Sequence, residues 1–194
     1  KRFIKLLEKI NFATNGNLRL MVDAGCRLNF NEALYLSQAM NELNCFFLEE
    51  PVARDYTQYS KLKKESKMPI AGGESLVSRD QFNTWVKHRA LDYLQPDANL
   101  AGVNEIIKID KLADTNNLKI ILHNWANDVN SATNAHLGAA LKTCQMVETN
   151  LTYNPLKKHL LKKRVNLKDG EFILSEKPGL GIEINESILN KYSF

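Results

Sequence analysis

The chain has 194 residues and a formal net charge of +4; 44% of its residues are hydrophobic and 25% are charged. This is the balance of a folded globular protein, and no run approaches the roughly 18–20 apolar residues that a membrane-spanning helix needs. The three cysteines, Cys26, Cys45 and Cys144, are odd in number and form no CxxC pair. Their spacing argues against a disulfide framework and a structural zinc site, and we expect a cytoplasmic protein.

The first part of the chain alternates between two kinds of segment. Residues 1–12 have an apolar stripe at helical spacing, which predicts a helix. Six short, nearly continuous apolar runs follow, which is typical of strands buried on both faces of a parallel sheet. They are LRLMVD (18–23), CFFLEE (45–50), MPIAGGE (68–74), LDYLQPD (91–97), LKIILH (118–123) and CQMVE (144–148).

Amphipathic stretches with helical spacing lie between these runs. They cover residues 31–43, 79–88, 103–114 and 131–143. Asn31 and Ser78 are the expected N-caps of the first two helices. When the first glutamate of the pair Glu49-Glu50 is taken, the polar residues that end the six runs are 26, 25, 23, 26 and 25 positions apart. A regular alternation of strand and helix at this period predicts right-handed βα repeats.

The C-terminal part predicts a different organisation. Residues 150–164 are expected to form a loop with a helical turn. Asp169 and Gly170 form a turn signal before a short strand at 171–175, and a second short strand is expected within 177–185.

Six consecutive βα units fit two architectures. A closed (β/α)8 barrel needs eight units and about 250 residues, and it brings the carboxyl ends of all strands together. An open dinucleotide-binding sheet would carry a glycine-rich loop after its first strand, which this sequence lacks. We therefore expect an α/β fold, with an incomplete (β/α)8 barrel over residues 1–164 and a tail with short strands over residues 165–194.

A basic run contributes much of the positive charge. It consists of Lys157, Lys158, Lys162, Lys163 and Arg164. Such a run can mark a nucleic-acid surface, but few aromatic residues interleave with it to stack on bases. We therefore expect a solvated loop or helix end, and neither a nucleic-acid nor a membrane partner.

Three carboxylates, Asp23, Glu49 and Glu74, end consecutive runs. Adjacent strands are about 4.8 Å apart, so these groups would repel one another without a cation. Oxygen ligands of this kind suit Mg²⁺. Pairing of each acid with a Lys or Arg is the alternative for a single acid, whereas three in register favour a metal site. Because successive strand residues face opposite sides, we expect Glu50 to support the site from its rim.

Asp97 and His123 end the next two runs. A carboxylate beside an imidazole fixes its tautomer and raises its basicity, which predicts His123 as a general base and Asp97 as its partner. A near-core histidine is the alternative. Glu148 ends the sixth run and is expected either to donate a hydrogen bond to a developing enolate oxygen or to form a salt bridge at the rim. Loops after the strands hold the candidate substrate-binding residues Asn99, Asn124 and Trp125.

Together, these motifs resemble the barrel domain of the enolase superfamily, and within it the mandelate racemase subgroup. They are VDAG at 22–25, FLEEP at 47–51, AGGE at 71–74, QPDANLAG at 95–102, LHNW at 122–125, VE at 147–148 and KPGLGIEI at 177–184. The resemblance spans essentially the whole chain. It implies Mg²⁺-dependent removal of the proton alpha to a carboxylate, which gives an enediolate.

The resemblance also implies residue roles. The matching residues are Asp23, Glu49 and Glu74 for the Mg²⁺ ligands, Asp97 and His123 for the dyad that defines the subgroup, and Glu148 for the acid on the eighth strand. Most subgroup members eliminate water from an acid sugar to give a 2-keto-3-deoxy product, and a few racemise instead. No lysine follows Asp97 closely, which argues against the branches that use a lysine on the sixth strand.

Three features depart from the family pattern. Asp23 is followed by Ala24-Gly25 where the family has DxN, and Ala101-Gly102 stands where it has two glycines. Only 22 residues precede Asp23, whereas the family carries a basic residue on strand two about 30 residues before the first metal ligand. We therefore expect the strand-two base, the first two barrel strands and the capping domain to be absent from this sequence.

These observations predict an enzyme, a Mg²⁺-dependent hydro-lyase that dehydrates an acid sugar and forms a homo-oligomer. A racemase or epimerase of 2-hydroxy acids with the same site is one alternative, and product analysis separates the two because only the first loses water. A chain that binds metal without catalysis is the other alternative, which the absent strand-two base favours.

Overall fold

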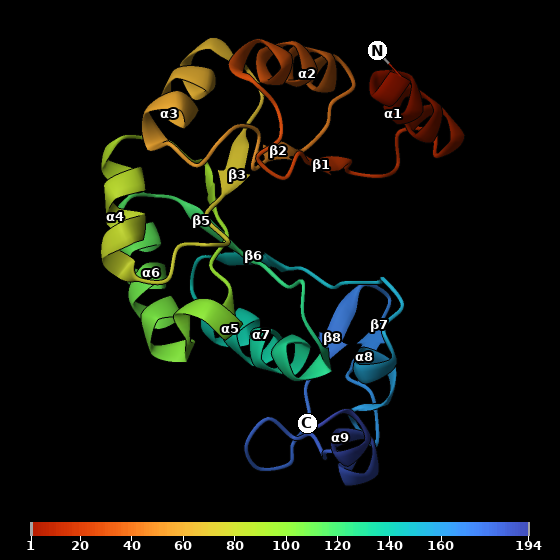
Figure 1. Cartoon of the computed structure of the whole chain (residues 1–194). Coiled ribbons are helices and arrows are strands. Elements are labelled where there is room, and N and C mark those ends of the chain that lie inside the picture. Colours follow the sequence, from red (N-terminus) through yellow and green to blue (C-terminus); the bar gives the residue numbers. More distant parts are fainter. Residues whose placement is uncertain (1, 194) are drawn as a thin grey trace. The chain divides into compact units, whose positions relative to one another are not determined.

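The structure is a computed structural model that describes residues 2–193, apart from the side chain of Lys158. The chain forms two compact units (Figure 1). The first takes in the chain up to Gly73 and Asp80–Leu94, and the second takes in Glu74–Arg79 and the chain from Gln95 onward.

The first unit holds four strands that pair in parallel in chain order. They are β1 (Met21–Asp23), β2 (Phe47–Glu49), β3 (Ile70–Gly72) and β4 (Tyr93–Leu94). Helix α1 precedes them and three helices connect them; these are α1 (Arg2–Ala13), α2 (Phe30–Glu42), α3 (Tyr56–Glu65) and α4 (Arg79–Lys87). Parallel strands need such crossovers, and the helices bury their apolar faces on the sheet.

The core of the first unit lies between strands and helices. Leu48 and Ile70 from the strands, and Met40, Leu62 and Phe82 from the helices, are completely or almost completely buried. Strands covered on both faces in this way are typically encoded by short, nearly continuous apolar runs.

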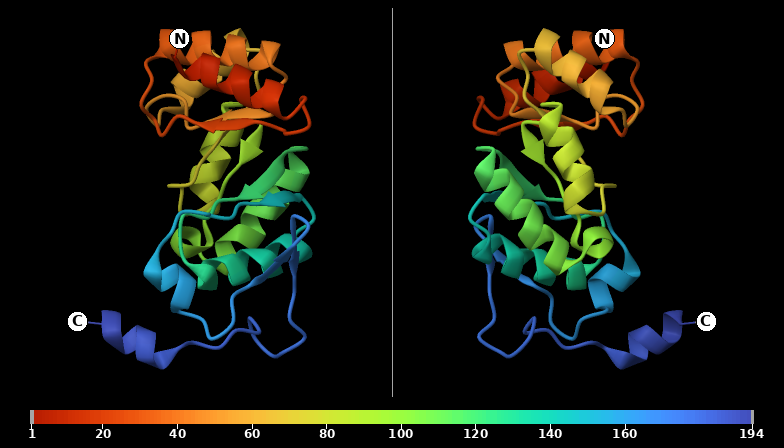
Figure 2. Two further views of the ribbon diagram at one scale, coloured as in Figure 1. Left: turned by 90° about the vertical axis from the view of Figure 1, so that its right-hand side faces the viewer. Right: turned by 90° about the vertical axis from the view of Figure 1, so that its left-hand side faces the viewer.

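The second unit continues the βα pattern. Its parallel strands are β5 (Lys119–Leu122) and β6 (Cys144–Val147). The helices that precede β6 in this unit are α5 (Ala98–Ala101), α6 (Val103–Thr115) and α7 (Asp128–Ala140). Helix α6 packs against β5 and α7 against β6 (Figure 2). After β6 come α8 (Pro155–His159), an antiparallel hairpin of β7 (Asn166–Lys168) and β8 (Glu171–Ile173), and α9 (Glu186–Tyr192).

The six predicted strands of the βα repeats are all present, but two helix starts differ from prediction. Asn29, not Asn31, caps α2, because Asn29 and Glu32 form a reciprocal capping box. Helix α7 begins at Asp128 rather than residue 131, because the side chain of Asn127 accepts from the backbone at its N-terminus. Helix α3 lies between two strands but was not predicted, since its sequence is mostly polar and buries only Tyr59 and Leu62.

Two expectations for the C-terminal part are corrected. Within residues 177–185, all of which the structure describes, the only β pairing is an isolated bridge from Ile184 to Leu161. The basic run is not uniformly solvated, because the side chain of Lys157 is only 5% exposed. Burial of Lys157 depends on contacts with distant segments, which the local sequence does not encode.

A search of the described helices finds none with both the length and the apolar character needed to cross a membrane.

Candidate active site

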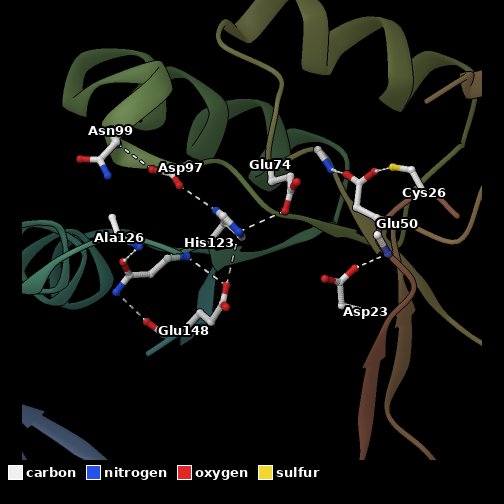
Figure 3. A network of polar contacts seen from close by, with 12 residues as sticks. Asp23, Cys26, Glu50, Glu74, Asp97, Asn99, His123, Ala126 and Glu148 are labelled. Atoms are coloured by element: carbon white, nitrogen blue, oxygen red, sulfur yellow. Dashed lines mark hydrogen bonds and ion pairs between the residues drawn. The ribbon is translucent and has the colours of Figure 1, made fainter. Parts of the chain in front are cut away.

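The second unit gathers four predicted site residues at its strand ends (Figure 3). Asp97 and His123 form an isolated parallel bridge just beyond β4 and β5, which brings their side chains together. Glu148 directly follows β6, and Glu74 follows β3 in sequence. The carboxyl ends of parallel strands are where such folds place their functional groups.

His123 is held between carboxylates on both ring nitrogens. Its Nδ1 lies 2.7 Å from Asp97 Oδ2, and its Nε2 lies 3.1 Å from Glu74 Oε2. Glu148 Oε2 lies 3.9 Å from the same Nε2. Because a carboxylate accepts from Nδ1–H, Asp97 leaves Nε2 as the nitrogen that can exchange a proton with a ligand.

The surroundings of His123 favour its charged form. Burial lowers the pKa of the imidazole, but hydrogen bonds to Asp97 and Glu74 and the charges of Glu148 and Glu74 outweigh burial and raise the pKa to about 10. Neutralisation of Glu74 by a cation would remove one of these interactions. The proton affinity of His123 therefore depends on what Glu74 binds.

Asn124 forms hydrogen bonds to Glu148 and to helix α7. Its backbone N–H donates to Glu148 Oε2 over 2.9 Å, and its side-chain amide donates to Ser131 Oγ over 2.9 Å. The side chain is completely buried. The structure therefore favours a positioning role for Asn124 over the substrate contact that the sequence suggested.

Helix α7 supplies two further amides that the sequence analysis missed. Asn130 Nδ2 donates to Asn124 Oδ1 over 3.1 Å and lies 3.5 Å from Asp97 Oδ1. Asn134 Nδ2 donates to the backbone oxygen of His123 over 2.9 Å. A signal was present in the sequence, because Asn130 and Asn134 recur at helical spacing within α7.

The other two candidate substrate-binding residues are exposed. The side chain of Trp125 is 67% exposed. Asn99 is also exposed, and its backbone N–H donates to Asp97 Oδ1 over 2.7 Å, which makes Asp97 the N-cap of α5. Both side chains are accessible to a ligand.

In the first unit, two predicted metal ligands face each other across paired strands. Asp23 and Glu49 are partners in the register of β1 and β2. Asp23 is exposed and accepts a hydrogen bond from the backbone of Gly25 over 2.7 Å, and Glu49 is half-buried. Among residues 2–193, no cluster of three or more His, Cys, Asp or Glu side chains is tight enough to hold a metal ion.

Glu50 is the buried carboxylate of this region, with 2% exposure. Tyr59 and Cys26 donate to its Oε2 over 2.8 and 2.9 Å, and the backbone of Gly73 donates to Oε1 over 2.8 Å. Arg54 Nε lies 3.3 Å from Oε2. Through these hydrogen bonds, Glu50 links the segments that follow β1, β2 and β3. Its carboxylate is therefore not presented to a ligand.

Comparison with known proteins identifies relatives over nearly the whole chain. A family model described as enolase C-terminal domain-like matches residues 2–188. Arabinonate dehydratase of Saccharolobus solfataricus is 30% identical over 191 residues, which cover 97% of this chain and 51% of that protein. The chain spans about half the length of the curated relatives it matches.

Solved structures agree with this result. The 3,6-anhydro-D-galactonate cycloisomerase from Zobellia galactanivorans matches with a TM-score of 0.92 at 28% identity, covering 98% of this chain and 55% of that one. An L-talarate/galactarate dehydratase mutant liganded with Mg and L-glucarate matches with a TM-score of 0.84 at 27% identity, covering 97% and 46%. These likenesses confirm the predicted α/β barrel class. The chain belongs to the enolase C-terminal domain-like family, as the resemblance of its strand-end motifs to the mandelate racemase subgroup of the enolase superfamily predicted.

Proposed function

We propose that this chain carries the proton-transfer residues of an acid sugar dehydratase, a hydro-lyase. One observation carries the proposal: Asp97 holds His123 Nδ1 at 2.7 Å, while Nε2 is turned toward Glu74 and Glu148. The printed name of the Saccharolobus relative, arabinonate dehydratase, supports an acid sugar as the substrate class.

In the proposed reaction, His123 Nε2 takes the proton alpha to the substrate carboxylate. Asp97 keeps the imidazole in the required tautomer and stabilises its charged form. The electron pair left by the proton forms a double bond to the β carbon as the β-hydroxyl leaves with one proton as water. The enol so formed tautomerises to a 2-keto-3-deoxy acid.

Glu148 is the proposed stabiliser of the charge that develops on the substrate. Protonated, it would donate a hydrogen bond to the carboxylate oxygen where negative charge accumulates. Asn124 holds Glu148 Oε2 through a backbone hydrogen bond of 2.9 Å, which supports a fixed orientation for this acid.

Asp23, Glu49 and Glu74 are the proposed Mg²⁺ ligands. All three offer carboxylate oxygens, the donors that Mg²⁺ prefers, and Asp23 is the register partner of Glu49 at the ends of β1 and β2, so the residues fit the ion. When bound, Mg²⁺ stabilises negative charge on the substrate carboxylate. A relative solved with Mg and L-glucarate supports the choice of metal.

Three predictions from the sequence enter the proposal unchanged. They are the cytoplasmic location, the homo-oligomeric state, and the division of the chain between residues 164 and 165.

The direct test is product analysis with the full-length protein. We expect Mg²⁺-dependent formation of a 2-keto-3-deoxy acid from at least one member of an acid sugar panel, and a chelator should abolish it. His123→Asn should lower by about 10³-fold both the formation of this product and the exchange of solvent deuterium into the alpha position of recovered substrate. His88→Asn, a change of the same type at an exposed position, should leave both unchanged.

The other two hypotheses predict different results. Inversion of a 2-hydroxy acid without loss of water would identify a racemase or epimerase. Mg²⁺ binding without product or deuterium incorporation from any acid in the panel would identify a chain that only binds metal.

A further inference from the structure

Lys157 in α8 is a buried ammonium group. Its side chain is 5% exposed, and among the residues that the structure describes its Nζ has no hydrogen-bond partner. Burial lowers the pKa of Lys157 and the charge of Arg164 acts in the same direction, whereas the charges of Asp128 and Glu148 act against this. A buried cation needs opposite charge nearby, and these two carboxylates supply it.

Asp128 receives a second cation from the same segment. It lies in the first turn of α7, is 3% exposed, and accepts from Arg164 Nε at 2.9 Å. The Arg164 side chain is 59% exposed, so it covers the carboxylate from the solvent side. The basic segment, residues 157–164, therefore supplies the ion-pair partner of a buried carboxylate, and the charge of the same carboxylate acts on the buried Lys157.

Helix α7 then connects Asp128 to the site. One turn further along, Ser131 Oγ accepts from Asn124, and Asn130 lies 3.5 Å from Asp97 Oδ1. Asn134 donates to the backbone oxygen of His123. A shift at the start of α7 would therefore displace groups that fix both members of the Asp97–His123 pair.

We infer that Arg164 and Lys157 are positioning residues: through Asp128 they hold the first turns of α7 against the strand ends and thereby fix the Asp97–His123 hydrogen bond. The basic run thus has a role within the chain. The expected effect on kcat rests on the proposed dehydration. The effect on the Asp97–His123 hydrogen bond does not, because this bond can be observed without any substrate.

The experiment compares Arg164→Gln and Lys157→Met with Lys163→Met in the full-length protein. Lys163 is exposed and lies in the same segment, so its variant removes the same charge without touching Asp128. We expect the first two variants to lower kcat about 10-fold with KM changed less than about 2-fold, because misplacement of a base affects the chemical step. Lys163→Met should behave like the parent, and Arg164→Lys should recover part of the lost rate.

Nitrogen-15 NMR of the imidazole supplies the second readout. The Nδ1–H signal of His123 is assigned from its absence in His123→Asn. We expect this signal to broaden and exchange faster with water in Arg164→Gln and Lys157→Met, and to stay sharp in Lys163→Met. Parent-like signals in Arg164→Gln and Lys157→Met would overturn the inference, whatever reaction the protein catalyses. A broadened signal in a protein that turns over no acid sugar would support the inference and contradict the proposed function.

A variant that fails to fold is handled by removing all three charges. Removal of one partner leaves an uncompensated buried charge, whereas removal of Asp128 together with both cations does not. The triple variant Asp128→Asn/Lys157→Met/Arg164→Gln is therefore expected to fold and still show a broadened His123 signal. A folded triple variant with the parent signal would overturn the inference.

Discussion

The carboxylates at the strand ends differ between the two units in exposure and in hydrogen bonding. In the first unit, Asp23 is exposed and Glu49 half-buried, and the buried carboxylate, Glu50, accepts from donors on four other residues. In the second unit, Asp97 is 5% exposed and lies 2.7 Å from the imidazole of His123. Accessible oxygens suit a cation that arrives from solvent, whereas a paired carboxylate suits proton transfer, because pairing fixes the tautomer.

The largest expected effect comes from the second unit. His123→Asn should lower kcat by about 10³-fold, the scale of general base catalysis, while Mg²⁺ still binds, because Asp23, Glu49 and Glu74 all remain. Steady-state kinetics and metal titration check the two parts. If the variant retained parent activity, His123 would not be the base.

Changes at the predicted metal ligands should have the opposite signature. Glu49→Gln should weaken Mg²⁺ binding by about 10–100-fold, since a neutral amide is a poorer ligand for a hard cation. Titration calorimetry measures this change. The His123 Nδ1–H signal should stay sharp in the same variant, and its loss would show that the two groups of carboxylates are not separable.

A smaller effect is expected at the buried carboxylate of the first unit. Glu50→Gln places an amide where Tyr59, Cys26 and Gly73 all donate, so unsatisfied donors remain. We expect the free energy of unfolding to fall by about 1–3 kcal/mol, measured by denaturant titration. Glu65→Gln, at an exposed position at the end of α3, is the matched control and should have little effect.

The smallest effect concerns Cys26. Burial, with the adjacent Glu50 carboxylate, raises the pKa of this thiol from 9.0 to about 12. Because the folded-state pKa is the higher one, the stability that the neutral thiol contributes is fully present below pH 9.0 and is lost as the pH rises toward about 12. Cys26→Ser should flatten this part of a plot of stability against pH. An unchanged slope would show that Cys26 does not contribute to it.

The same neutral thiol should react slowly with iodoacetamide near pH 8, because the thiolate is the reacting form. Glu50→Gln should accelerate alkylation of Cys26, which peptide mass spectrometry measures at that residue. An unchanged rate would show that the adjacent carboxylate does not suppress its ionisation.

Several features of the site could be predicted because they follow from local order along the chain. A period near 25 residues, with a polar residue after each apolar run, places those residues at the carboxyl ends of parallel strands. That reasoning predicted a carboxylate beside an imidazole, and the structure brings Asp97 and His123 within hydrogen-bond distance. The same reasoning predicted that Glu50 is not a metal ligand, because successive residues of a strand face opposite sides.

The support around these residues could not be predicted, because it depends on segments far apart in sequence. Arg164 reaches Asp128 across 36 positions, and this contact pairs a charge that is buried at the start of α7. Similarly, Asn124 follows a strand just as a substrate-binding residue would. Its burial against Ser131 and Glu148 favours a positioning role instead.

The sequence by itself determined the order of the six parallel strands, the family, and which acids and which histidine follow the strands, since strand patterns and motifs are local. Tertiary structure alone decided that Lys157 is buried, that Glu50 is enclosed by donors, and that amides of α7 stand behind the Asp97–His123 pair. The physical reason is that burial and hydrogen-bond satisfaction belong to the packed arrangement, in which a side chain acquires its role from neighbours that its own segment does not contain.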